Sequence, residues 1–96
     1  MGETTEIRDG RTYYGRIWAP GEYGNPIHPS IFDMRVGSGQ RVWSIIGYLE
    51  TYGWDIDAVT KLFEGLTRED VLAAIEFYNQ HKKDIDERLA EDASLV

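Results

Sequence analysis

The side chains that most often bind transition metals are scarce in this chain, which has two histidines and no cysteine. His81 and Asp84 are one helical turn apart and could share a metal ion, but a lone His-x-x-Asp spacing is usually a charge pair at a helix end. The other histidine, His28, stands in a proline-flanked loop without a second ligand at a useful spacing, and no cysteine can supply a thiolate. We therefore expect no metal site and no cofactor.

Two pairs of carboxylates have a spacing that acid–base chemistry could use. Asp55 and Asp57 form the first pair, and Asp84 and Asp86 form the second. Both pairs stand where helices are expected to begin, and acidic residues are favoured at that end of the helix dipole. The turn at residues 37–39 lacks the lysine and the spacing of a phosphate-binding loop. The sequence favours a binding protein over an enzyme.

The stretch at residues 39–89 predicts three short helices joined by glycine-containing turns. The first helix ends at Gly53, Asp55 caps a second that ends at Gly65, and Thr67 opens the third with a T-x-x-D form of the capping box. The turn between the second and third helices has the length and the glycine of a helix-turn-helix. Apolar residues recur at helical spacing, namely Val42, Ile45, Ile46 and Leu49, then Ile56, Val59, Leu62 and Phe63, then Val71, Ala74, Ile75 and Tyr78.

Residues 82–96 form an amphipathic arm. Tyr78, Ile85 and Leu89 follow one another at intervals of seven and four, which continues the apolar stripe of the third helix. Such an arm can lie in a groove of a partner protein, pack on a second copy, or fold back on its own core. The sequence leaves these three alternatives open.

The N-terminal part predicts a small β region. Residues 1–10 lack apolar periodicity and are expected to be a flexible lead-in, whereas residues 11–18 and 30–36 alternate as two short strands would. Two strands are marginal alone, and aromatic residues such as Tyr13 and Trp18 suit a subunit interface, so we expect a homodimer. A thin core capped by these aromatics is the alternative.

The expected fold is mostly α, of the α+β class, in one domain. A two-stranded β region and loop at residues 11–38 precedes a three-helix, homeodomain-like helix-turn-helix core at residues 39–81, and the arm at residues 82–96 follows. No apolar run reaches the about 20 residues that a membrane helix needs, and the first residues do not resemble a secretory leader. We expect no membrane association and a cytoplasmic location.

The net charge of −7 is unevenly distributed along the chain. Five basic residues balance five acidic ones up to Arg41, whereas five face twelve from Val42 onward. DNA affinity depends largely on lysine and arginine, so the charge argues against a strong DNA binder acting alone. If DNA is bound, we expect contacts mainly to phosphates from four residues: Arg35, Arg41, Lys61 and Arg68.

Residues 39–89 resemble a bacterial and archaeal family, domain-of-unknown-function family 433. The resemblance rests on Arg41-Val42-Trp43-Ser44-Ile45-Ile46-Gly47-Tyr48-Leu49, Gly53, Asp55-Ile56, Leu66-Thr67-Arg68-Glu69-Asp70-Val71, Ala73-Ala74-Ile75, Tyr78 and Lys83-Asp84-Ile85-Asp86. Many members are described as VapB-type antitoxins encoded beside a PIN-domain ribonuclease toxin. The resemblance implies a helix-turn-helix antitoxin that neutralises such a toxin and autoregulates transcription through operator DNA.

Two hypotheses about function follow. The first is this antitoxin, with partner or dimer contacts through Tyr13, Trp18, Tyr78, Ile85 and Leu89. The second is a dimeric protein-interaction module without a DNA role. Because the third helix carries Glu69, Asp70 and Glu76, the first hypothesis predicts weak or partner-dependent DNA binding.

Overall fold

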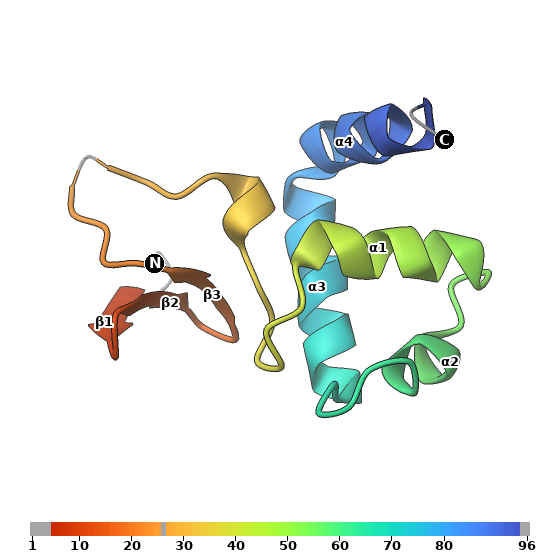
Figure 1. The fold of residues 1–96 in the computed structure, drawn as a ribbon, viewed down its shortest axis with the longest axis horizontal. Coiled ribbons are helices and arrows are strands. Elements are labelled where there is room, and N and C mark those ends of the chain that lie inside the picture. Colours follow the sequence, from red (N-terminus) through yellow and green to blue (C-terminus); the bar gives the residue numbers. More distant parts are fainter. Residues whose placement is uncertain (1–4, 26, 95–96) are drawn as a thin grey trace.

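The computed structural model describes residues 5–25 and 27–94, which form a β-sheet beside a bundle of helices (Figure 1). Within these residues there are three strands, a short 3₁₀ helix and four α-helices. The prediction of two strands and a three-helix core was therefore wrong, although the fold is α+β. The elements are β1 (Thr5–Arg8), β2 (Arg11–Tyr14), β3 (Ile17–Pro20), η1 (Ile31–Asp33), α1 (Val42–Thr51), α2 (Ile56–Thr60), α3 (Arg68–Gln80) and α4 (Lys82–Ser94).

The sheet is an antiparallel meander in the order β1-β2-β3. Asp9 and Gly10 join β1 to β2, and both have positive φ angles, 53° and 71°, as tight two-residue hairpin turns require. Gly15, with a φ of 68°, begins the turn between β2 and β3. The predicted single strand at residues 11–18 is therefore two strands, because the chain reverses at Gly15.

The second predicted strand, at residues 30–36, is mostly absent. The Ser30 side chain accepts a hydrogen bond from the Phe32 N–H at 3.2 Å, which caps the helical turn η1 instead. Beyond η1 only Arg35 pairs as a strand residue, in isolated antiparallel bridges with Trp18 and with Arg41. These two bridges extend the sheet up to Arg41, the residue immediately before α1.

The predicted helix starts at Asp55 and Thr67 are confirmed. The Asp55 carboxylate accepts a hydrogen bond from the Ala58 N–H at 3.1 Å and so caps α2. At α3 the Thr67 hydroxyl accepts from the Asp70 N–H at 3.1 Å, and the Asp70 carboxylate accepts from the Thr67 N–H at 3.3 Å. This reciprocal pair is a capping box, and it fixes where α3 begins.

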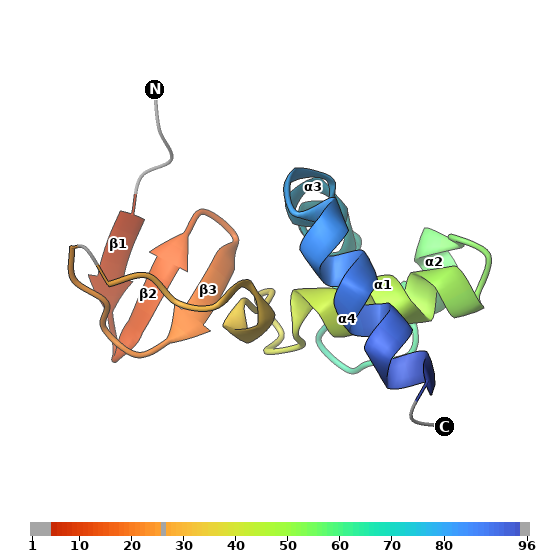
Figure 2. The same cartoon turned by 90° about the horizontal axis from the view of Figure 1, so that it is seen from above.

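The arm is a separate helix that folds back on the chain's own core. The chain turns at His81, so α4 crosses α1 instead of continuing α3 (Figure 2). Ile85 is fully buried, Leu89 packs against the core, and the Tyr78 hydroxyl donates to the Asp86 carboxylate at 2.6 Å. Among the alternatives left open by the sequence, the structure therefore has the arm on its own core.

One hydrophobic core connects the sheet to the helices. The inner face of β3 and the segment after η1 contribute Ile17, Ala19, Met34 and Val36, and the helices and the turn before α3 contribute Val42, Ile45, Ile46, Leu49, Val59, Leu66, Val71, Ala74, Tyr78 and Ile85. Burial of this apolar surface is what holds the two halves together. No helix in the described part of the chain is both long and apolar enough to cross a membrane.

Candidate functional site

The outer face of the sheet collects arginine and aromatic side chains. Arg11 and Tyr13 alternate with the core-facing Thr12 along β2, so they lie on the side away from the core. The strand register pairs Arg8 with Arg11 and Tyr13 with Trp18, and residues paired in this way project from the same face. Basic and aromatic groups from three strands therefore share one surface.

The two isolated bridges extend this surface toward the helices. Trp18 pairs with Arg35, and Arg35 pairs with Arg41, so a row of side chains runs from Tyr13 to the residue that precedes α1. We call this surface the arginine–aromatic face, and it consists of Arg8, Arg11, Tyr13, Trp18, Arg35 and Arg41. It holds four of the ten basic residues in a chain whose net charge is −7.

The aromatic rings on this face hold the guanidinium groups in place. Arg8 lies over the Tyr13 ring at 4.3 Å from its centroid, and Arg11 lies over the Trp18 ring at 4.1 Å. Arg35 contacts the same indole at 5.8 Å, and Trp18 is only 7% exposed between the two arginines. A stacked guanidinium keeps its N–H edges available for a carboxylate or a phosphate. The face is thus preorganised for anions.

Few negative charges oppose these arginines. Among the strand residues that the structure describes, Glu6 is the acidic one that the register places on this face, and its carboxylate lies 3.5 Å from Arg8 Nε. Both side chains of this ion pair are more than half exposed, so solvent screens the attraction. Arg35 Nη1 also donates to the Gly39 carbonyl at 3.4 Å, which positions that guanidinium further.

The start of α3 is a different electrostatic environment. Arg68 Nη1 donates to the Asp57 carboxylate at 2.6 Å in an ion pair about as exposed as that of Arg8 with Glu6, and the exposed Glu69 and Glu76 follow on the same helix. Lys61 is exposed at the end of α2. The four residues predicted to contact DNA therefore form two groups, with Arg35 and Arg41 at the sheet and Lys61 and Arg68 near the α2–α3 turn.

The residues predicted for an interface are also divided between two places. Tyr13 and Trp18 belong to the arginine–aromatic face, whereas Tyr78 and Ile85 are 5% and 0% exposed inside the chain's own core. Leu89 is partly buried against that core. The structure thus brings together Tyr13 and Trp18, predicted for subunit contacts, with Arg35 and Arg41, predicted for DNA.

Sequence reasoning missed Arg8 because residues 1–10 were expected to be a lead-in, and it missed Arg11 because the strand that pairs with Arg11 lies in that segment. A local signal was present in Asp9-Gly10, since an Asp-Gly pair between alternating residues is a strong indication of a hairpin. A hairpin there would have placed Arg8 directly opposite Arg11, as the structure does.

Tyr78 and Tyr14 have altered acidity, and neither belongs to the arginine–aromatic face. Burial, reinforced by the hydrogen bond to Asp86, raises the pKa of Tyr78 to about 12. Burial also raises the pKa of Tyr14, with a further contribution from Tyr23. Both phenols are therefore neutral at physiological pH.

The histidine and aspartate considered for metal binding lie at a helix junction. His81 ends α3 with its ring 4.4 Å from the Phe77 ring, and Asp84 stands in the first turn of α4. Among residues 5–25 and 27–94, no three His, Asp or Glu side chains are grouped closely enough to hold a metal ion.

A comparison with protein families gives one match. The model of the family described as protein of unknown function, DUF433, matches residues 28–78, more than half of the chain. The matched segment contains Arg35, Arg41 and helices α1 and α2, and it reaches Tyr78 in α3, whereas β1, β2, β3 and α4 lie outside it. No curated protein and no solved structure matches the chain. The resemblance that the sequence indicated is confirmed, and the chain belongs to the DUF433 family.

Proposed function

We propose that this protein is a non-catalytic antitoxin that neutralises a PIN-type ribonuclease and binds DNA through the arginine–aromatic face. The observation that carries the DNA part is the alignment of four arginines and two aromatic rings on one side of the sheet. The toxin part is supported by the family resemblance of the helical segment. Both roles place the protein in the cytoplasm.

The arginine–aromatic face suits a phosphate backbone. The guanidinium groups of Arg8 and Arg11 lie over the Tyr13 and Trp18 rings, respectively, and these two arginines are direct neighbours across β1 and β2. Phosphate oxygens accept paired hydrogen bonds from a guanidinium, and each neutralised phosphate releases counterions from DNA. Contacts of this kind position a protein on DNA with little sequence preference.

The sheet is a better candidate for this contact than α3. Helix-turn-helix proteins usually present the second helix of the motif to the major groove. In this chain α3, the helix that the sequence predicted for that role, exposes Glu69 and Glu76, and its first-turn arginine, Arg68, donates a hydrogen bond to Asp57. Phosphates near α3 would meet net negative charge, whereas phosphates near β2 would meet arginines.

The test compares two double variants of the full chain in gel-shift titrations. The probe is the duplex upstream of the protein's own gene, with and without the partner, and a scrambled duplex of equal length as reference. The variant pair is Arg8→Ala with Arg11→Ala, and the matched control is Lys61→Ala with Arg68→Ala. The sheet variant should make the slope of log affinity against log salt shallower by about two, because about two phosphate contacts are lost.

Two outcomes would reject the proposed DNA contact. If the Lys61 and Arg68 variant loses binding while the sheet variant retains it, DNA is bound at the α2–α3 turn. If neither free protein nor its complex shifts DNA at low salt, the DNA role is wrong.

The toxin role has a separate test. The gene beside this protein's gene is expressed alone and together with it, and growth and RNA cleavage are measured. The proposal expects a small PIN-type nuclease whose toxicity and cleavage activity are lost at a stoichiometric amount of this protein. A neighbouring product that is not a nuclease, or a nuclease that stays fully active in the mixture, would contradict the antitoxin role.

A dimeric interaction module without DNA binding is the second candidate. It is favoured by an aromatic patch on α1 and the segment after α2, formed by Tyr48, Tyr52 and Phe63. Tyr48 and Tyr52 are 40% and 46% exposed, and the Tyr48 ring packs edge-on against Phe63 at 5.2 Å. Exposed aromatics are enriched at protein interfaces. A dimer by light scattering that Tyr48→Glu converts to a monomer, together with no DNA binding, would favour this candidate.

A further inference from the structure

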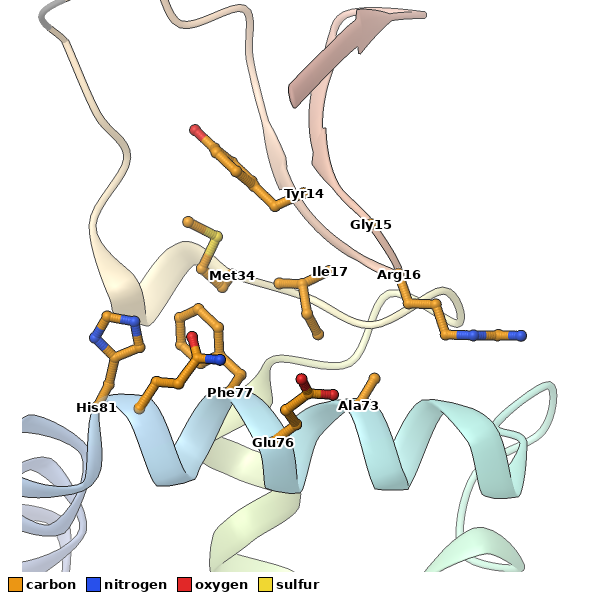
Figure 3. Close-up of a pocket in the computed structure, with 10 residues that line it drawn as sticks. Tyr14, Gly15, Arg16, Ile17, Met34, Ala73, Glu76, Phe77 and His81 are labelled. Carbon is orange, nitrogen blue, oxygen red and sulfur yellow. The ribbon is translucent and has the colours of Figure 1, made fainter. Parts of the chain in front are cut away.

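A slot of about 390 Å³ lies between the β2–β3 turn and α3 (Figure 3). One wall comes from the sheet side, where Tyr14, Ile17 and Met34 line the slot and Ile17 points toward α3, and the other comes from Ala73 and Phe77 of α3. The volume is within the range of small-molecule sites and suits a single ring with a short substituent. The walls are mostly apolar, so an occupant needs an apolar body.

The charge presented to this slot is negative. The Glu76 carboxylate extends from α3 toward the sheet wall (Figure 3), and no residue in the described ranges forms a hydrogen bond or an ion pair with it. Arg16, the arginine among the lining residues, extends away from the slot in the same view, and its Nη1 lies 4.0 Å from Asp70 Oδ1. Glu76 therefore has no partner at the mouth of an apolar slot, and an anion entering the slot would be repelled.

The aromatic walls add a second preference for positive charge. Tyr14 and Phe77 line the slot from opposite sides. The faces of aromatic rings attract cations, most strongly where water is partly excluded. Tyr14 supplies a neutral ring here, since its phenol stays protonated at neutral pH.

We propose that this slot binds a small organic cation, an amine or amidine carried on a flat apolar body. The ring of the ligand lies between Ile17 and Phe77, and its cationic group pairs with Glu76. The inference is independent of the proposed DNA and toxin roles, because none of its residues belongs to the arginine–aromatic face.

Three probes of similar shape and different charge separate the effect of charge on binding from the effect of shape. Benzamidine, benzamide and benzoate share one ring and carry a positive, a neutral and a negative substituent. Each is titrated into the full-length, ¹⁵N-labelled protein, and the backbone amides of Gly15, Ile17, Ala73 and Phe77 are followed by NMR. We expect benzamidine to bind about fivefold more tightly than benzamide, with benzoate weakest, because an exposed ion pair and a cation–π contact contribute modestly.

Glu76→Gln is the deciding variant. Glu76 is exposed on α3, so the variant keeps the fold, and it should reduce benzamidine binding to the level of benzamide without changing benzamide itself. Glu69→Gln, which removes an exposed carboxylate from the same helix outside the slot, is the matched control and should leave all three probes unchanged. Benzoate binding as tightly as benzamidine, an unaffected benzamidine affinity in Glu76→Gln, or no binding of any probe would each overturn the proposal.

Discussion

Trp18 and Arg35 exchange both of their backbone hydrogen bonds, at 2.8 and 2.7 Å, across a single-residue antiparallel bridge. The Trp18 indole also donates from Nε1 to the Val36 carbonyl at 2.7 Å. Because Trp18 belongs to β3 and Arg35 to the segment matched by the family, this pair joins the N-terminal sheet to the family's own part of the chain. This bridge aligns Arg35 with the arginines and aromatic residues of the sheet, and the neighbouring bridge from Arg35 to Arg41 completes the arginine–aromatic face.

Trp18→Ala should be among the most destabilising substitutions in the sheet. The side chain is 7% exposed and hydrogen-bonded, so its removal leaves a cavity and takes away one of the two hydrogen bonds that the Val36 carbonyl accepts, the other coming from the Gly39 N–H. We expect a loss of about 3–5 kcal/mol in the free energy of unfolding, measured by urea denaturation. Trp54→Ala is the control, because Trp54 is 43% exposed, and it should cost far less. Equal losses would mean that Trp18 does not hold the two parts together.

The raised pKa of Tyr78 predicts that the folded protein loses stability at alkaline pH. Its pKa in the folded protein is about 12, above the ordinary value of 10, so the unfolded chain loses this proton first as pH rises. The stabilisation is complete below pH 10 and is lost progressively as pH rises toward 12. Tyr78→Phe should cost about 1–2 kcal/mol at pH 7 through the lost hydrogen bond to Asp86.

The measurement compares wild type and Tyr78→Phe in urea at neutral pH and at intervals above pH 9. Lysines also lose their charge in this range, so only the difference between the two proteins is informative. That difference should shrink as pH rises. A constant difference across the range would contradict the raised pKa.

The helix starts could be read from the sequence because capping depends on neighbouring residues. Asp55 and Thr67 each need a backbone N–H three residues further on, and both form that hydrogen bond.

Thr67→Ala should lower the free energy of unfolding by about 1 kcal/mol, and Thr67→Ser, which retains the hydroxyl, should lower it little. Thermal unfolding of the two variants checks this. A Thr67→Ser protein as unstable as Thr67→Ala would show that the hydroxyl does not cap α3.

The strands were harder to predict than the helix starts, because the positions of the turns decide where each strand begins and ends. Gly15 lies inside a stretch that alternates like one strand, and only its positive φ reveals the reversal. The residues around Ser30 also alternate, but a local hydrogen bond from Phe32 favours a helical turn. Where a side chain competes with strand pairing in this way, alternation alone overpredicts strands.

The two proposed binding surfaces differ in how far the sequence could reveal them. Arg35 and Arg41 were recognised as candidates from charge alone, but their neighbours Arg8 and Arg11 required the strand register. The slot combines Tyr14 with Phe77, which are far apart in the chain and belong to different elements. Such a site arises from tertiary packing, so no local sequence pattern predicts it.

Substitutions at Gly47 in α1 and Leu89 in α4 test whether the two helices pack together in solution. A methyl group at Gly47 would lie 3.1 Å from Leu89 Cδ2, a close contact that the leucine must relieve by moving. Leu89→Ala alone should cost about 2 kcal/mol through lost packing. In that background Gly47→Ala should stabilise the protein by about 1 kcal/mol, the usual advantage of alanine over glycine inside a helix.

In the wild-type background the same Gly47→Ala substitution should gain little or nothing, because the contact with Leu89 opposes the helix propensity. Urea denaturation of the two single variants and the double variant gives the coupling between the sites. An equal gain in both backgrounds would mean that α4 is detached from α1, as an arm reserved for a partner would be. A positive coupling would place Leu89 on its own core and leave the sheet, the aromatic patch on α1 and the slot as the surfaces available for binding.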